Sequence, residues 1–143
     1  MESHNMKVVI LAGGKGTRLP EYTKSIPKPL VKIGSKPILE HIIDYYIKFG
    51  FKDFLIAGGY KYTHIEKYFR NKKKSAKIRV FNTGLNSLTG KRLVKLKKEL
   101  TSTFMLTYGD GISNVDLNKL LKFHKKNKKK ITVTAVHPPS RFG

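Results

Sequence analysis

Hydrophobic residues gather along the chain in short runs that are rich in β-branched residues and end at glycine or polar turn formers. The run Met6–Ala12 (MKVVILA) is followed at once by Gly13 and Gly14, which is typical of a buried strand that ends in a tight turn. Four later runs share this character. The pattern therefore predicts five strands, at Met6–Ala12, Asp53–Ala57, Lys77–Phe81, Thr103–Tyr108 and Lys130–Val136.

Between these runs, apolar residues recur at the three- and four-residue spacing of a helix. In Pro37–Phe49 the proline suits the first helical turn, and Gly50 suits the position just after the end. Asn82–Gly90 holds turn-forming residues and is predicted to be a loop. We predict four helices, at Pro37–Phe49, His64–Arg70, Gly90–Leu100 and Asp116–Lys126.

The alternation of strands and helices predicts an α/β fold with a parallel sheet that carries helices on both faces. Ligands of such sheets bind beyond the carboxyl ends of the strands. The glycine turns at 13–16, 58–59 and 109–111 all fall at such ends, so we expect one cleft there. We find neither an internal repeat nor a domain boundary. We predict one domain over residues 6–143, preceded by a leader at residues 1–5.

The formal net charge is +21, with 25 Lys and 5 Arg among 143 residues. One interpretation is a nucleic-acid-binding surface, because basic residues release counterions from phosphate. The other is a lysine-rich surface with anionic small ligands. The second interpretation is favoured because Arg, whose guanidinium can form two parallel hydrogen bonds to phosphate or a base, is scarce. The lysines also lie in separate places, at Lys72–Lys74, Lys95–Lys98 and Lys125–Lys130.

The absence of cysteine excludes a disulfide framework and thiolate metal sites. The longest apolar run, Val8–Ala12, is far shorter than the roughly 20 residues that cross a bilayer. The sequence shows no secretory leader, so we expect a cytoplasmic protein that does not engage a membrane.

The segment with the clearest chemistry follows the first predicted strand. Glycines at 13, 14 and 16 let backbone N–H groups approach phosphate oxygens, and Thr17 and Arg18 add a hydroxyl donor and a forked cation. The segment is neither a P-loop nor a G-x-G-x-x-G dinucleotide fingerprint. Glycine content alone fits a plain turn equally well, and Thr17 and Arg18 favour anion binding.

Two further residues stand where charged groups could meet the same anion. Lys28 lies between Pro27 and Pro29, which stiffen the chain, and it could neutralise a phosphate leaving group. Asp110 follows the fourth predicted strand and could hold Mg²⁺ against phosphate. The alternatives are a surface lysine and a turn-capping aspartate.

Taken in order, the motifs GGKGTRL, PKP and GDG resemble those of the sugar-phosphate nucleotidylyltransferases. Further segments are similar to the branch of that family that uses CTP and glucose 1-phosphate. They are Asn82–Gly84, Leu88–Leu93, Thr107–Gly111, Phe123–His124 and Pro138–Gly143. The resemblance extends from Met6 to Gly143 and implies a Rossmann-like three-layer α/β sandwich with a mostly parallel sheet.

The resemblance implies transfer of CMP from CTP to glucose 1-phosphate, with Mg²⁺ as cofactor. Arg18, Lys28 and Asp110 would be catalytic, and Asp110 would be the metal ligand. The implied nucleotide-binding residues are Leu11, Ala12, Gly13, Gly14, Lys15, Gly16, Thr17, Arg18, Lys28, Ser87, Thr89, Arg92 and Gly109.

Members of that family continue beyond the Arg141-Phe142-Gly143 motif with a sugar-phosphate lysine and a second metal-binding aspartate. On this resemblance the chain is the nucleotide-binding half of the enzyme. Two explanations remain open. Another polypeptide, such as a complementary C-terminal half, would complete the chain, or the chain would act as a short stand-alone form. A homo-oligomer is a further option. The alternatives are a non-catalytic nucleotide-binding module and, less favoured, a basic nucleic-acid-binding protein.

Overall fold

The computed structural model of the protein describes residues 4–16, 24–70, 72 and 75–137. The chain divides into two compact units, residues 1–113 and 114–143, and the single domain over residues 6–143 stays a prediction. The first unit holds the sheet and the glycine turns. Within the described ranges, no helix has the length and apolar character that crossing a membrane requires.

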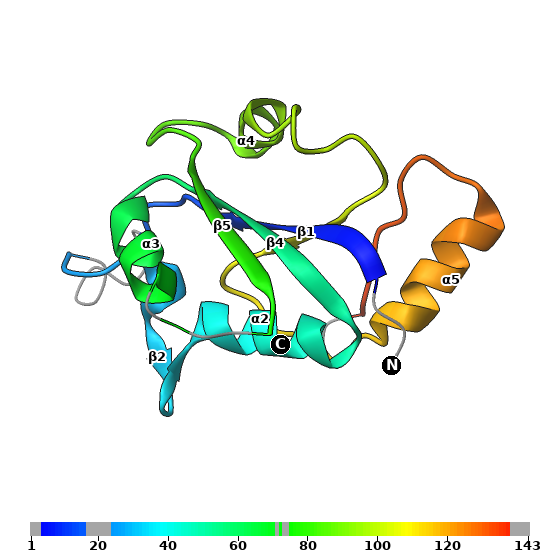
Figure 1. The fold of residues 1–143 in the computed structure, drawn as a ribbon, viewed down its shortest axis with the longest axis horizontal. Helices are drawn as coiled ribbons and strands as arrows, with labels where there is room; N and C mark the ends of the chain where they lie inside the picture. Colours follow the sequence, from blue (N-terminus) through cyan, green and yellow to red (C-terminus); the bar gives the residue numbers. More distant parts are fainter. Residues whose placement is uncertain (1–3, 17–23, 71, 73–74, 138–143) are drawn as a thin grey trace, which may run out of the picture. The chain divides into compact units, whose positions relative to one another are not determined.

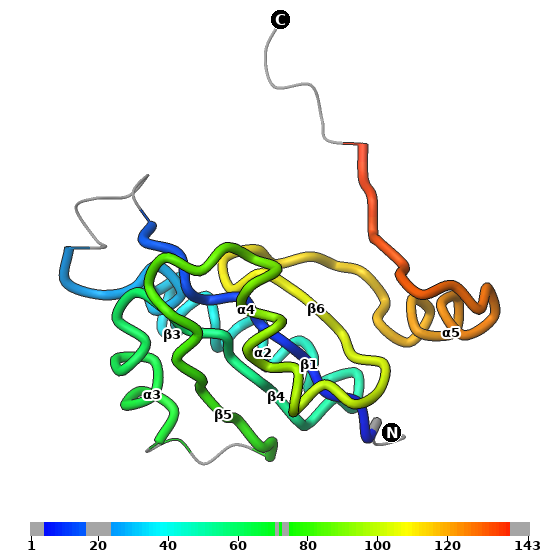
Figure 2. Tube along the Cα trace, turned by 90° about the horizontal axis from the view of Figure 1, so that it is seen from above, coloured from blue at the N-terminus to red at the C-terminus, as the bar shows by residue number. Residues whose placement is uncertain are grey.

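The first unit is built on a parallel sheet of four strands in the order β5-β4-β1-β6. Figures 1 and 2 show these strands side by side. The sheet confirms four of the five predicted strands, which are β1 (His4–Ala12), β4 (Phe51–Gly58), β5 (Lys77–Asn82) and β6 (Met105–Tyr108). β1 starts at His4, which pairs with Phe51, so the strand includes two residues that the sequence analysis assigned to a leader.

Helices α2 (Ile38–Lys48) and α4 (Thr89–Lys95) cover opposite faces of this sheet (Figure 1). Alternate strand residues serve the two faces, because successive side chains of a strand point to opposite sides. Phe54 packs its ring against Tyr46 of α2, whereas Leu55 belongs to a core cluster with Leu96, next to α4. The predicted three-layer α/β architecture is confirmed.

The helix ends follow local sequence signals. α2 begins after Pro37, and Gly50 adopts φ +90° after its last turn, as predicted. α3 (Tyr62–Arg70) starts two residues before its predicted position. α4 is shorter than predicted, because residues after Lys95 continue in tight turns in which Leu96 N–H donates to Leu93 O and Glu99 N–H to Leu96 O.

The segment between β1 and α2 contains short elements that the hydrophobic pattern does not reveal. A single 3₁₀ turn, η1 (Lys28–Leu30), precedes an antiparallel hairpin of β2 (Lys32–Ile33) and β3 (Lys36–Pro37). Gly34, at φ +64°, supplies the turn of the hairpin. Two-residue strands are too short to produce a readable alternation of polar and apolar positions.

The second unit contains α5 (Leu117–Asn127), which begins after Asp116, whose side chain accepts a hydrogen bond from Lys119 N–H at 2.9 Å. The predicted strand at Lys130–Val136 is wrong. Residues 131–137 have no regular secondary structure, and Ile131, Val133 and Val136 are 77–79% exposed. A strand requires hydrogen bonds to a neighbour, and none of the described residues pairs with this apolar run.

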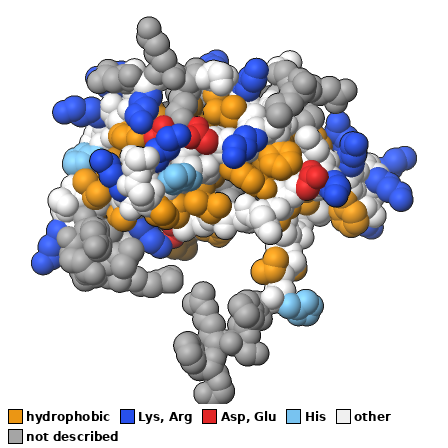
Figure 3. Space-filling view, turned by 90° about the horizontal axis from the view of Figure 1, so that it is seen from below, with side chains coloured by type: hydrophobic (Ala, Val, Ile, Leu, Met, Phe, Trp, Pro, Cys, Tyr) orange, Lys and Arg blue, Asp and Glu red, His pale blue; other side chains and the backbone are white. Residues whose placement is uncertain are grey.

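Basic side chains stand in separate groups on the face drawn in Figure 3, with apolar surface between them. Several cations are held by carboxylates instead of being gathered into one patch. Arg79 of β5, for example, donates to Asp53 at 3.1 Å and to Glu99 at 2.6 Å. This distribution fits a lysine-rich surface better than a continuous nucleic-acid-binding stripe.

The hydrogen bond from Arg79 lowers the pKa of Glu99 in the folded protein. We therefore expect the contribution of Glu99 to protein stability to depend on pH. A carboxyl with a lowered folded-state pKa stabilises the protein above its unfolded-state pKa and loses that contribution as the pH falls. We expect Glu99→Gln to lower the melting temperature by about 2 °C at pH 7 and to have no effect below about pH 3. Thermal melts from pH 3 to 7 measure this. Glu66→Gln, at an exposed Arg70 pair, is the control, and a pH-independent loss would contradict the prediction.

Candidate functional site

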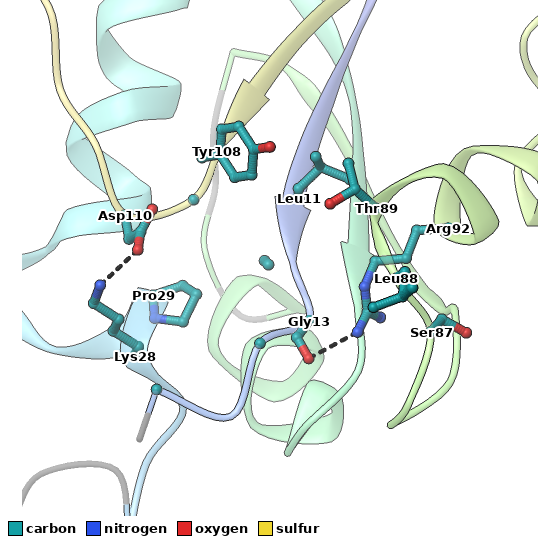
Figure 4. A pocket seen from close by; sticks show the side chains of 14 residues that line it. Leu11, Gly13, Lys28, Pro29, Ser87, Leu88, Thr89, Arg92, Tyr108 and Asp110 are labelled. Carbon is teal, nitrogen blue, oxygen red and sulfur yellow. Dashed lines mark hydrogen bonds and ion pairs between the residues drawn. The ribbon is translucent and has the colours of Figure 1, made fainter. Parts of the chain in front are cut away.

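A cavity of about 350 Å³ lies at the carboxyl ends of β1 and β6. It is open to solvent and is drawn in Figure 4. The turns after β1 and β6 both contribute to its wall, as the sequence predicts. The lining residues are Leu11, Ala12, Gly13, Gly14, Gly16, Lys28, Pro29, Ser87, Leu88, Thr89, Arg92, Tyr108, Gly109 and Asp110.

One side of the cavity carries an ion pair between residues that are far apart in the sequence. Lys28 Nζ donates to Asp110 Oδ2 at 2.6 Å, and the two side chains are 31% and 41% exposed. Lys28 is held there by η1, in which Leu30 N–H donates to Pro27 O at 2.8 Å and Pro29 and Leu30 are buried. Asp110 lies two residues after the end of β6. The fold thus brings a cation and an anion together at the mouth of one cavity.

Asp110 supplies the carboxylate in the lining of this cavity. No group of three or more potential metal-ligating side chains occurs among the described residues. Mg²⁺ often takes only one or two protein carboxylates and completes its shell with phosphate and water. Among the described residues, the site does not form an all-protein metal cage, and its one carboxylate fits only an ion that completes its shell with phosphate and water.

The turn after β6 packs closely against the end of β1. Gly109 N–H donates to Leu11 O at 2.9 Å, and a Cβ at Gly109 would lie 3.2 Å from that same oxygen. Gly16 has φ +67°, a backbone conformation that favours glycine. The third glycine turn, at 58–59, does not line the cavity. It lies behind the first, with Tyr60 N–H donating to Gly13 O at 3.3 Å.

Arg92 belongs to α4, on the sheet face opposite α2, and its side chain extends to these turns. It is 6% exposed, and burial lowers the pKa of its guanidinium. Its Nη2 donates to Gly13 O at 3.0 Å, and its Nη1 donates to Gly58 O, Thr83 Oγ1 and Gly84 O at 3.2, 2.7 and 2.9 Å. Figure 4 shows the guanidinium turned toward Gly13.

The side of the cavity nearest α4 is otherwise uncharged. Ser87, Leu88 and Thr89 lie there, across the cavity from Lys28 and Asp110 (Figure 4). Leu88 is 82% exposed, so its apolar side chain is accessible at the cavity rim. Lys28 and Asp110 form the charged side of the cavity, which suits phosphate. On the other side, termed the neutral side, the lining residues are hydroxyl and apolar groups beside Arg92, whose guanidinium donates to neutral oxygens.

Comparison with known proteins identifies the kind of molecule that carries this cavity. Residues 7–143 match the nucleotidyl transferase family. The chain belongs to that family. Because the match takes in almost the whole chain, both units of this nucleotidyl transferase fall within it.

Named relatives share the family and differ in their nucleotides. The chain is 41% identical to a glucose-1-phosphate cytidylyltransferase of Salmonella typhimurium over 96% of its own length and 63% of the relative. It is 36% identical to a D-glycero-alpha-D-manno-heptose 1-phosphate guanylyltransferase of Campylobacter jejuni, with 88% and 55% coverage. This nucleotidyl transferase chain thus spans less than two thirds of the curated relatives it matches.

Solved structures give the same assignment of the fold. HddC of Yersinia pseudotuberculosis, in complex with GMP-PN, superposes with a TM-score of 0.72 at 28% identity. The match covers 83% of this chain and 54% of that one. The fold is therefore that of the nucleotide-diphospho-sugar transferases, which confirms the Rossmann-like α/β sandwich with a mostly parallel sheet that the resemblance implies.

Most residues that the resemblance implicates line the cavity of this nucleotidyl transferase. Lys15 is described and exposed but is not among the lining residues, and Thr17 and Arg18 lie outside the described residues. The implicated residues that do line the cavity are Leu11, Ala12, Gly13, Gly14, Gly16, Lys28, Ser87, Thr89, Arg92, Gly109 and Asp110.

Sequence reasoning missed three lining residues, which are Pro29, Leu88 and Tyr108. Tyr108 had a usable signal, because it is the last residue of a predicted strand whose carboxyl end faces the cleft. Leu88 gave none, since a leucine before a predicted helix is ordinarily assigned to the core. Pro29 was interpreted only as a stiffener of Lys28.

Proposed function

We propose that this nucleotidyl transferase transfers CMP from CTP to glucose 1-phosphate and releases pyrophosphate. A phosphate oxygen of the sugar phosphate attacks the α-phosphorus of CTP, and the bond to the β-phosphate oxygen breaks with its electron pair leaving on pyrophosphate. The identity to a cytidylyltransferase supports CTP and glucose 1-phosphate over the guanylyl chemistry of the Campylobacter relative. The chain would supply the nucleotide-binding part.

One observation carries the proposal, namely the meeting of Lys28 and Asp110 at 2.6 Å beside a glycine turn. Transfer of a phosphoryl-type group needs little covalent help, so positioning and charge supply most of the rate. The Lys28 ammonium would balance charge on the triphosphate, and Asp110 would hold Mg²⁺, which neutralises phosphate charge when bound. Arg18 would add a further cation to the same phosphates.

The neutral side of the cavity suits the nucleoside. Ser87 and Thr89 each offer a hydroxyl that can donate and accept hydrogen bonds, and Gly109 lets a ribose approach the backbone. The phosphates would then point toward Lys28 and Asp110. No side-chain nucleophile is required for this direct displacement.

Pyrophosphate release by the full-length protein tests the proposal. We expect release from CTP and Mg²⁺ that depends on glucose 1-phosphate, with slower release from GTP and UTP. Coupled phosphate detection after pyrophosphatase treatment measures it. Binding of CTP without release in the presence of any sugar 1-phosphate would overturn the enzyme and leave a nucleotide-binding module.

The ion pair predicts opposite effects of one substitution with and without metal. In chelator, Asp110→Asn removes a negative charge from the cavity and frees Lys28, so we expect CTP affinity to rise about threefold. With Mg²⁺ present, the loss of the carboxylate is expected to lower CTP affinity about tenfold. Calorimetric titration in both buffers measures this. Asp44→Asn, at the Lys36 ion pair, is the control, and parallel changes in both buffers would contradict the prediction.

A further inference from the structure

Arg92 is a buried cation whose hydrogen-bond acceptors are all neutral. The four oxygens that it contacts are three backbone carbonyls and one threonine hydroxyl. Burying a guanidinium costs free energy unless its N–H groups donate to acceptors. Here the acceptors are oxygens of the turns and not a carboxylate. Such an arrangement fixes the turns as firmly as it fixes the arginine.

The acceptors belong to the carboxyl ends of three neighbouring strands. Gly13 follows β1, Gly58 ends β4, and Thr83 and Gly84 follow β5. The strand order β5-β4-β1 places these ends side by side. A single side chain from α4 therefore connects three turns, of which only the turn at Gly13 lines the cavity.

Glycine makes room for the arginine at two of these turns. A Cβ on Gly13 would lie 2.1 Å from Arg92 Nη1, and a Cβ on Gly59 would lie 2.7 Å from the same atom. The glycine turn at 58–59, which does not line the cavity, thus has a physical reason for its composition. The turns and Arg92 form one packed unit.

We propose that Arg92 is a positioning residue for the nucleotide, which it serves by holding the Gly13–Gly14 turn in shape and not by contacting the phosphates. The proposal rests on the proposed function, and it differs from the direct nucleotide contact that the resemblance implies. Both hydrogens of Nη1 are committed, because three oxygens lie within its reach, and Nη2 donates to Gly13 O, so the guanidinium is oriented by the turns.

Lysine distinguishes the two roles. A direct cation–phosphate contact would be largely preserved by Arg92→Lys, because the charge remains. The hydrogen bonds by which Arg92 holds the turns, termed the brace, would be lost in Arg92→Lys. A single ammonium cannot take the place of two separated nitrogens that contact Gly13 O and Thr83 Oγ1 at once.

The experiment measures two quantities in the full-length protein, CTP affinity with MgCl₂ by calorimetry and amide hydrogen exchange without ligand. For Arg92→Lys we expect CTP affinity to fall about tenfold or more. In the ligand-free protein, the amides of Tyr60 and Thr83 should exchange about tenfold faster, because their acceptors, Gly13 O and Gly58 O, lose the brace.

A second variant avoids dependence on a fully folded Arg92→Lys protein. Thr83 does not line the cavity, yet its hydroxyl accepts from Arg92 and donates to Gly58 O at 2.6 Å. Thr83→Val should weaken CTP binding about threefold, and Thr83→Ser should restore it. The matched control is Arg79→Lys, a second arginine with several hydrogen bonds, remote from the cavity lining. It should lower the melting temperature and leave CTP affinity unchanged.

Three results would overturn the proposal. They are near wild-type CTP affinity in Arg92→Lys, unchanged exchange at Tyr60 and Thr83 in a variant that has lost affinity, and unchanged CTP affinity in Thr83→Val. A wild-type protein that binds neither CTP, GTP nor UTP would overturn the proposed function instead. The exchange rates would then still decide whether Arg92 braces the turns.

Discussion

Replacing Lys28 by methionine is expected to lower kcat/KM for CTP and glucose 1-phosphate about a thousandfold. Methionine keeps the length of the side chain and removes the ammonium that lies 2.6 Å from Asp110 at the charged side of the cavity. Without it, charge on the triphosphate would be balanced less well, and Asp110 would add uncompensated negative charge beside the phosphates. Steady-state pyrophosphate release measures the change.

Lys36→Met is the matched control for this substitution. Lys36 forms an ion pair of similar geometry with Asp44, at 2.8 Å, but does not line the cavity. We expect its kcat/KM to stay within about twofold of the wild type, since a partly exposed ion pair contributes little. Equal losses in the two variants would show that general charge, and not the position of Lys28, supports turnover.

The largest expected effect on stability comes from Gly59→Ala. The added methyl group would lie 2.6 Å from Gly13 O, 2.9 Å from Gly84 O and 2.7 Å from Arg92 Nη1. Two of these three atoms are backbone, so the clash cannot be relieved by rotating one side chain. We expect a loss of about 3 kcal/mol in the free energy of unfolding, at the upper end of the cost of overpacking. Urea denaturation measures it.

Gly90→Ala is the control, because a Cβ there would meet nothing within 4 Å. Gly90 lies in α4, where alanine is the better helix former, so this variant should gain about 0.5–1 kcal/mol. The same chemical change is thus expected to have opposite signs at the two glycines. A tolerated Gly59→Ala would contradict the tight packing of the three turns.

The strands and the long helix could be predicted because their signals are local. β1 and β4 are apolar on both faces, and α2 carries a complete apolar stripe between a proline and a glycine. The meeting of Lys28 and Asp110 could also be anticipated. The rule that ligands bind beyond the carboxyl ends of parallel strands predicted a cleft at three glycine turns, and the turns at 13–16 and 109–111 do line the cavity, whereas the turn at 58–59 does not.

The features that could not be predicted depend on tertiary packing, which local sequence patterns do not record. The apolar run at Lys130–Val136 has the pattern of a strand. A strand needs a neighbouring strand to pair with, and sequence periodicity does not show whether one is present. Arg92 gives a similar lesson. Its motif predicts a charged residue that meets an anion, and this stays a prediction, but the motif does not show that α4 buries Arg92 and that its guanidinium donates to the turns after three strands.

We propose that one cavity, and not the overall positive charge, binds a nucleoside triphosphate. Calorimetric titration of the full-length protein with CTP and MgCl₂, repeated with excess single-stranded oligonucleotide, tests it most directly. We expect one CTP bound per chain, weakened at least about tenfold by Lys28→Met and unaffected by the oligonucleotide. Wild-type CTP affinity in Lys28→Met, with the oligonucleotide displacing CTP, would contradict the account.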